Sequence, residues 1–114
     1  MNVLVVGTGY VGLNTGVALA YLGHQVVCID VAQEKIDKLN KGQLPIYEPF
    51  LDKMLAAAHT NIKFTTDYDD ANISEADVVF ISVGTPSLPD GSSDLSFVKS
   101  VAEEIGRRLN DNFT

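Results

Sequence analysis

"VVGTGYVGL", residues 5–13, places three glycines between an apolar, β-branched run and a helical pattern. Gly7 permits a tight turn out of a strand, Gly9 lets the backbone approach a phosphate group, and Gly12 lets the following helix pack against the sheet. The N-terminus of such a helix directs N–H groups and the positive end of its dipole at the same place. The motif predicts a strand, turn and helix that bind the pyrophosphate of a dinucleotide, although an ordinary glycine turn remains the alternative.

Strands and helices alternate along the rest of the chain. Short apolar runs predict buried strands, and apolar residues at three- and four-residue steps predict helices. The predicted strands cover residues 3–6, 25–30, 62–66 and 77–83. The predicted helices cover residues 10–22, 31–42, 48–58 and 94–110, the last with Asp94 as its N-cap. We therefore expect an α/β fold, the N-terminal part of a Rossmann-like, doubly wound parallel sheet with strand order 3-2-1-4.

Composition and charge narrow the class of protein. A chain of 114 residues that is 46% hydrophobic suits one soluble domain with one core. Eight basic against fifteen acidic residues give a net charge of −7, the wrong sign for a surface that binds DNA or RNA. No apolar run reaches the roughly 20 residues that span a bilayer, and the N-terminus lacks the features of a signal peptide. We expect a cytoplasmic protein without nucleic-acid or membrane partners.

Two features carry no catalytic or metal chemistry in our interpretation. Cys28 is the only cysteine and lies inside a predicted strand, so we expect it to pack in the core. The acidic "DYDD" at residues 67–70 suggests a solvated turn rather than a cation site. With no second cysteine near Cys28, the sequence predicts no metal centre.

Asp30 ends the second predicted strand, eighteen positions after Gly12. A carboxylate at this place can accept hydrogen bonds from both ribose hydroxyls of NAD, and it would repel the additional phosphate of NADP. The alternative interpretation is a solvated aspartate at a strand end. Asp30 therefore favours NAD as the cofactor.

Three longer motifs resemble a known family. They are "GTGYVGL" at residues 7–13, "DVAQEKIDKLNKGQLPIYEP" at residues 30–49 and "ADVVFISVGTPSLPDGSSDLSFV" at residues 76–98. Across all 114 residues the chain resembles the UDP-glucose and GDP-mannose dehydrogenases, and its "VGTP" form is most similar to the bacterial UDP-glucose 6-dehydrogenases. That resemblance implies an NAD-dependent oxidoreductase, which oxidises the C6 alcohol of a nucleotide sugar to a carboxylate in two hydride transfers. UDP-glucose is the expected substrate, with GDP-mannose and other UDP-sugars as alternatives.

The same resemblance assigns roles to individual residues. To the pyrophosphate it assigns Gly7, Gly9, Tyr10, Val11 and Gly12. It assigns Asp30 and Lys35 to the adenosine ribose. Next to the cofactor it places Thr85. The position of Gly84, Thr85 and Pro86 agrees, because they follow the fourth predicted strand, where open α/β sheets bind ligands, although an ordinary proline loop is the alternative. Phe50 departs from the family, which more often has glycine after "YEP".

The family's catalytic cysteine and lysine belong to a later "GxCxPKD"-like motif that these 114 residues lack. We therefore expect residues 1–114 to be an NAD-binding N-terminal fragment with no catalytic residue, inactive by itself. A separate nucleotide-binding module is a second hypothesis. A third is a unit that self-associates, as a homodimer, through the exposed edge of the strand at residues 77–83.

Overall fold

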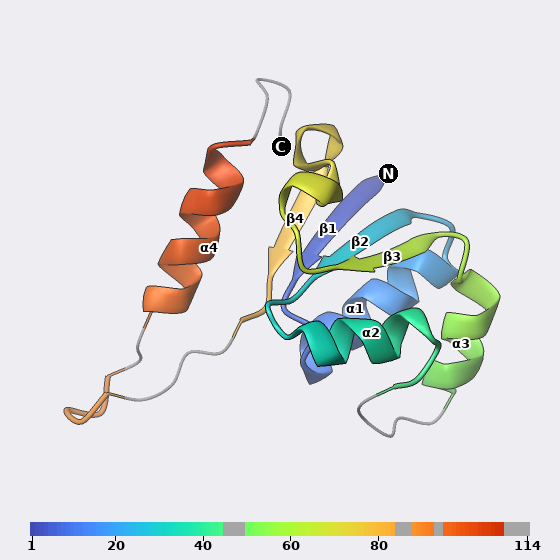
Figure 1. Ribbon diagram of the computed structural model, residues 1–114, viewed down its shortest axis with the longest axis horizontal. Helices are drawn as coiled ribbons and strands as arrows, with labels where there is room; N and C mark the ends of the chain where they lie inside the picture. The colour runs from blue at the N-terminus through green and yellow to red at the C-terminus, as the bar shows by residue number, and fades with distance from the viewer. Residues whose placement is uncertain (45–49, 84–87, 93–94, 109–114) are drawn as a thin grey trace.

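Four parallel strands form a single sheet (Figure 1). The computed structural model describes residues 1–44, 50–83, 88–92 and 95–108. Its strands are β1 (Asn2–Val6), β2 (Gln25–Ile29), β3 (Ile62–Thr65) and β4 (Val78–Ile81). They lie in the order β3-β2-β1-β4, so the predicted order 3-2-1-4 and the parallel, doubly wound α/β class are confirmed.

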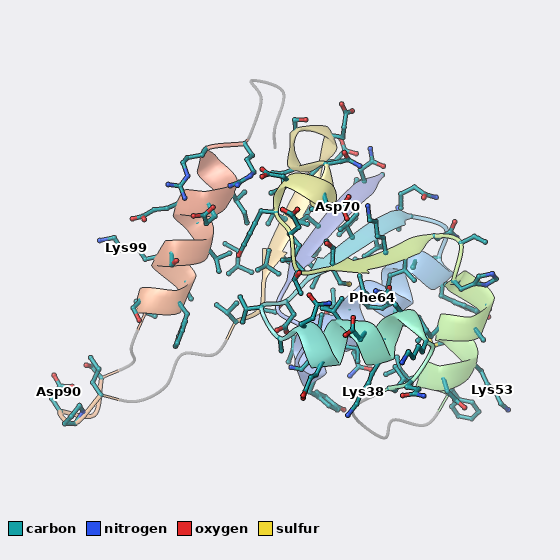
Figure 2. The ribbon with its side chains drawn as sticks, in the orientation of Figure 1. Lys38, Lys53, Phe64, Asp70, Asp90 and Lys99 are labelled. Carbon is teal, nitrogen blue, oxygen red and sulfur yellow. The ribbon has the colours of Figure 1, made fainter. Side chains whose placement is uncertain are left out.

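Helices cover both faces of this sheet. The helices are α1 (Tyr10–Tyr21), α2 (Gln33–Asn40), α3 (Leu51–Ala58) and α4 (Ser96–Gly106). Figure 1 shows α1, α2 and α3 on one side of the strands and α4 on the other. Lys99 projects from the side of α4 that faces away from the sheet (Figure 2). The chain is thus a three-layer arrangement with the sheet in the middle.

The central strand β1 contributes to both cores, because successive side chains of a strand point to opposite faces. Val3 and Val5 pack in the core shared with α1, α2 and α3. Leu4 and Val6 pack in the smaller core shared with α4. A strand that is buried on both faces is apolar throughout, which explains why residues 3–6 show no alternation of polar and apolar residues.

The connection from β3 to β4 contains two 3₁₀ turns, η1 (Asp69–Ala71) and η2 (Ile73–Glu75), within the predicted polar turn. These turns bury Ala71 and Ile73 against the same sheet face as α4. They thereby occupy part of the face that a longer crossover helix would otherwise cover.

Helix α4 differs from the sequence prediction at both ends, and its N-cap is Leu95 rather than Asp94. Helix α4 ends at Gly106 rather than near Asn110, and the Arg108 N–H donates to the Ile105 carbonyl at 2.9 Å in a tight final turn. Asn110 and the predicted N-cap Asp94 lie outside the described residues. In the described part of the chain, no helix has the length and apolar character needed to cross a membrane.

Candidate functional site

A cleft of about 550 Å³ lies at the carboxyl ends of the strands, between the glycine turn and α4. The glycine turn forms one wall, through Gly7 and Gly9. Asp30 and Lys35 line the cleft from the end of β2 and the start of α2. The structure therefore brings together residues that are up to 28 positions apart in the sequence, at the edge of a parallel sheet where ligands bind.

Gly7 and Gly12 are required by the protein's own packing. Gly7 has φ +99°, a left-handed conformation that residues with a side chain rarely adopt, and a Cβ atom there would lie 2.6 Å from the Ser82 carbonyl oxygen. A Cβ atom on Gly12 would lie 2.0 Å from the carbonyl oxygen of Gly7. These two glycines allow β1, α1 and the end of β4 to meet closely.

Gly9 has a different environment. A Cβ atom added to Gly9 would have no neighbouring atom within 4 Å, and its φ of −73° is accessible to any residue. Neither packing nor backbone conformation therefore explains a glycine at this position. Close approach of the backbone to a ligand in the open space does explain it.

The first turn of α1 adjoins this open space. Gly9 is the N-cap of α1, and the Leu13 N–H donates to the Gly9 carbonyl at 2.9 Å as the first bond of the helix. The preceding N–H groups, those of Val11 and Gly12 among them, have no carbonyl partner within the helix. No acidic residue lies in this first turn. The helix end therefore presents the donors and the positive dipole end that stabilise an anion.

Asp30 is held by three hydrogen bonds and one ion pair. Its Oδ2 atom accepts hydrogen bonds from the Thr8 N–H at 2.9 Å and from the Thr8 hydroxyl at 2.8 Å. Its Oδ1 atom accepts one from the Ala32 N–H at 3.0 Å, and Lys35 Nζ lies 3.6 Å from Oδ2. Burial raises the pKa of Asp30, but the hydrogen bonds from Ala32 and Thr8 and the charge of Lys35 together lower it below its usual value. Asp30 is thus a fixed anion at neutral pH.

Comparison with known proteins identifies the family of the chain. The family model of the UDP-glucose/GDP-mannose dehydrogenase family, NAD binding domain, matches residues 1–114. The chain belongs to this family. The UDP-glucose 6-dehydrogenase of Rickettsia bellii is 46% identical over 96% of the chain, and that of Rhizobium meliloti is 48% identical over 96%. The chain spans about a quarter of the length of these two relatives, 26% and 25%.

Solved structures of this dehydrogenase family have the same fold. A UDP-glucose dehydrogenase from Pyrobaculum islandicum superposes with a TM-score of 0.86 at 40% identity, over 93% of this chain and 25% of that one. A GDP-mannose dehydrogenase from Pseudomonas aeruginosa superposes with a TM-score of 0.85 at 40% identity, over 93% of this chain and 24% of that one. The predicted family resemblance is therefore confirmed, and NAD is the cofactor of the domain.

The described residues fit NAD in three respects. The open space beside Gly9 has room for a phosphate against the backbone, the first turn of α1 presents N–H donors to it, and Asp30 lines the same cleft next to the glycine turn. The other predicted contacts are more peripheral, since Tyr10 and Val11 are 58% and 66% exposed on the first turn of α1. Gly84, Thr85 and Pro86 lie outside the described residues, although the preceding Ser82 and Val83 line the cleft.

The wall of the cleft on the side of α4 is formed by residues that the sequence analysis did not single out. Tyr68 comes from the segment interpreted as an acidic turn, and Phe97, Val101 and Glu104 come from α4. Arg108 connects the two segments, because its Nε–H donates to Asp69 Oδ1 at 2.8 Å and its guanidinium carbon lies 5.6 Å from the centre of the Tyr68 ring. No local motif marks these residues, because they meet only when α4 packs on the sheet.

Cys28 is buried, as the sequence predicts, and two carboxylates of the acidic turn form ion pairs. Asp70 forms an ion pair with Lys63 at 3.1 Å, and Asp69 pairs with Arg108. Burial raises the pKa of the Cys28 thiol to about 12, so the thiol is protonated and unreactive at neutral pH. Within the described ranges, no group of three or more His, Cys, Asp or Glu side chains could hold a metal ion.

Proposed function

We propose that residues 1–114 form the NAD-binding N-terminal part of a nucleotide-sugar dehydrogenase that converts UDP-glucose to UDP-glucuronate in two NAD-dependent oxidations. The observation that carries the cofactor site is Gly9, whose missing side chain is explained by a ligand and by nothing in the protein itself. In the family, NAD accepts the hydride. The substrate is proposed from the curated relatives named UDP-glucose 6-dehydrogenase, and GDP-mannose and other UDP-sugars are the alternatives.

Each predicted residue has a role in this proposal. The pyrophosphate contacts the glycine turn and the start of α1, formed by Gly7, Gly9, Tyr10, Val11 and Gly12. Asp30 accepts a ribose hydroxyl, and Lys35, whose Nζ lies 3.6 Å from Asp30 Oδ2, contacts the same adenosine ribose. Gly84, Thr85 and Pro86 are proposed to follow the cofactor past the end of β4. No residue of the chain is proposed to be catalytic, so the 114 residues alone should not oxidise a nucleotide sugar.

A titration of the purified chain with NADH, followed by fluorescence or calorimetry, tests the cofactor site. We expect saturable NADH binding, at least tenfold weaker binding of NADPH, and at least tenfold weaker NADH binding by Asp30→Ala, because the variant removes the ribose acceptor. Asp37→Ala is the matched control, because Asp37 lies on the exposed side of α2 and pairs with Gln33. Equal binding of NADH by the wild type and Asp30→Ala would contradict the assignment.

Self-association is a second proposal, supported by the edge strand β4. Its side chains Phe80 and Ile81 are 40% and 39% exposed, an unusual exposure for an apolar strand of a parallel sheet. Because β4 is the last strand in the described sheet, its outer edge can accept another strand. We propose a homodimer through this edge when the chain is studied as 114 residues. A cytoplasmic location stays a prediction from the sequence.

A further inference from the structure

Thr8, between the first two glycines of the motif, is the polar residue on which this inference rests. The described residues include two buried polar side chains, Thr8 and Thr65, and Thr8 is the less exposed at 1%. Its hydroxyl and its N–H both donate to Asp30 Oδ2, across 22 positions of sequence. The glycine motif treats position 8 as a variable spacer. The structure instead makes Thr8 the direct connection between the phosphate turn and the ribose carboxylate.

The hydrogen bonds of Asp30 show what this connection does. A carboxylate oxygen has two lone pairs, and Thr8 uses both on Oδ2. The Ala32 N–H uses one of the two on Oδ1. Among the described residues, one acceptor position therefore remains, on Oδ1, so that in this arrangement Asp30 can accept one ribose hydroxyl rather than both. The side chain is only 12% exposed. The carboxylate cannot rotate about its Cβ–Cγ bond without breaking these bonds.

We propose that Thr8 is a positioning residue for NAD, holding Asp30 so that Oδ1 receives a ribose hydroxyl. The inference rests on the proposed NAD-binding function. A carboxylate held in this orientation also cannot turn away from the additional phosphate of NADP, so the two charges repel each other. Thr8 thereby contributes to the affinity for NAD and to the preference for NAD over NADP.

The decisive variants test the hydroxyl of Thr8 separately from its volume. Thr8→Val has the same shape and no hydroxyl, and we expect it to weaken NADH binding about fivefold to tenfold, because a charge-assisted hydrogen bond is lost. The preference for NADH over NADPH should fall with it. Thr8→Ser restores the hydroxyl and should bind NADH within about twofold of the wild type. Thr8→Ala, which cannot clash with its neighbours, should repeat the loss if the valine variant folds poorly.

A second measurement does not depend on the cofactor. NMR titration of the Asp30 carboxyl group in the folded chain should show a higher pKa in Thr8→Val than in the wild type, since the anion has lost a donor. Thr8→Ser should leave that pKa unchanged. If Thr8 only fills space, valine would leave the pKa of Asp30 unchanged as well.

The control is Thr66→Val, which removes a hydroxyl that donates to Gln33 Oε1 at 3.2 Å rather than to Asp30. It should bind NADH as the wild type does. NADH binding by Thr8→Val within twofold of the wild type would overturn the positioning role. Failure of the wild type and of Thr66→Val to bind NADH would instead overturn the cofactor proposal, and the role of Thr8 with it. The inference is supported if NADH binding is weakened in Thr8→Val and Thr8→Ala and in neither Thr8→Ser nor Thr66→Val.

Discussion

At the level of single residues, the glycines of the motif have separable causes. Gly12 is required because a Cβ atom would collide with the Gly7 carbonyl oxygen, and Gly7 is required by its left-handed backbone. Gly9 meets neither condition, so the packing and the backbone of the described residues do not explain a glycine at this position. A motif that is counted as one pattern in the sequence therefore divides into a structural part and a ligand-binding part.

Substitution of these glycines by alanine should separate the two parts. We expect Gly12→Ala to lower the free energy of unfolding by more than 2 kcal/mol, since the backbone must move to make room for the methyl group. Gly9→Ala should change that free energy by less than about 0.5 kcal/mol and weaken NADH binding at least tenfold. Urea unfolding and NADH titration measure the two effects. Wild-type NADH binding by a folded Gly9→Ala variant would contradict the ligand-based explanation of Gly9.

Phe50 is a residue with a backbone conformation that favours glycine. It has φ +69° at the N-cap of α3, its ring is 68% exposed, and Lys53 Nζ lies 5.8 Å from the ring centre. The left-handed conformation costs a residue with a side chain about 1–2 kcal/mol. The structure thus gives a physical reason to expect that glycine would suit this position better than phenylalanine.

We therefore predict that Phe50→Gly is more stable than Phe50→Ala by about 1 kcal/mol. Both variants lose the ring and its contact with Lys53, so the difference isolates the backbone conformation. At an ordinary exposed position the alanine variant would be the more stable of the two, because glycine makes the unfolded chain more flexible. The midpoints of urea unfolding measure the difference. Equal midpoints, or a more stable alanine variant, would show that the left-handed conformation is not strained.

At the level of elements, α4 differs from the other helices in how little of it is buried. Only Val101 and Ile105 of α4 are buried, in the smaller core under β1 and β4. The same helix supplies Phe97 and Glu104 to the wall of the cleft on its side. The shape of the cleft therefore depends on two apolar side chains and on the contacts of Arg108.

Ile105→Ala should test that dependence. Ile105 is 4% exposed, and removal of a buried isoleucine side chain costs about 2–5 kcal/mol. We expect a loss of this size in urea unfolding and faster amide hydrogen exchange in α4 than in α1. Glu103→Ala, at an exposed position of the same helix, is the control and should change little. Unchanged exchange in α4 would show that Arg108 alone keeps the helix in place.

At the level of the whole molecule, the exposed edge and faces of β4 are the main departure from a closed α/β domain. The chain spans about a quarter of the length of its curated relatives, and the described sheet ends at β4. The two half-exposed apolar side chains of β4 are therefore accessible to a second copy at high protein concentration. The net charge of −7 opposes this association, and salt should strengthen it by screening that charge.

We predict a dimer that forms with increasing concentration and is lost in Phe80→Lys, because a charged side chain on an edge strand prevents pairing. Analytical ultracentrifugation over a range of concentrations measures the equilibrium. Leu22→Lys, which changes a 72% exposed residue at the end of α1, is the control and should dimerise as the wild type does. A wild-type chain that stays monomeric at millimolar concentration would contradict the homodimer proposal.

The sequence alone identified the order and type of the strands and helices, the parallel sheet, the family, and the turn of Gly7, Gly9 and Gly12 with Asp30. These features follow from local causes, since apolar periodicity and the steric freedom of glycine act within a few residues. Only folding brought Thr8 to Asp30, across 22 positions, and Arg108 to Asp69, across 39. Such contacts depend on strand register and on how α4 packs against the sheet. The sequence therefore located the glycine turn and Asp30, and the tertiary structure supplied the residue that holds Asp30 and the wall of the cleft that α4 forms.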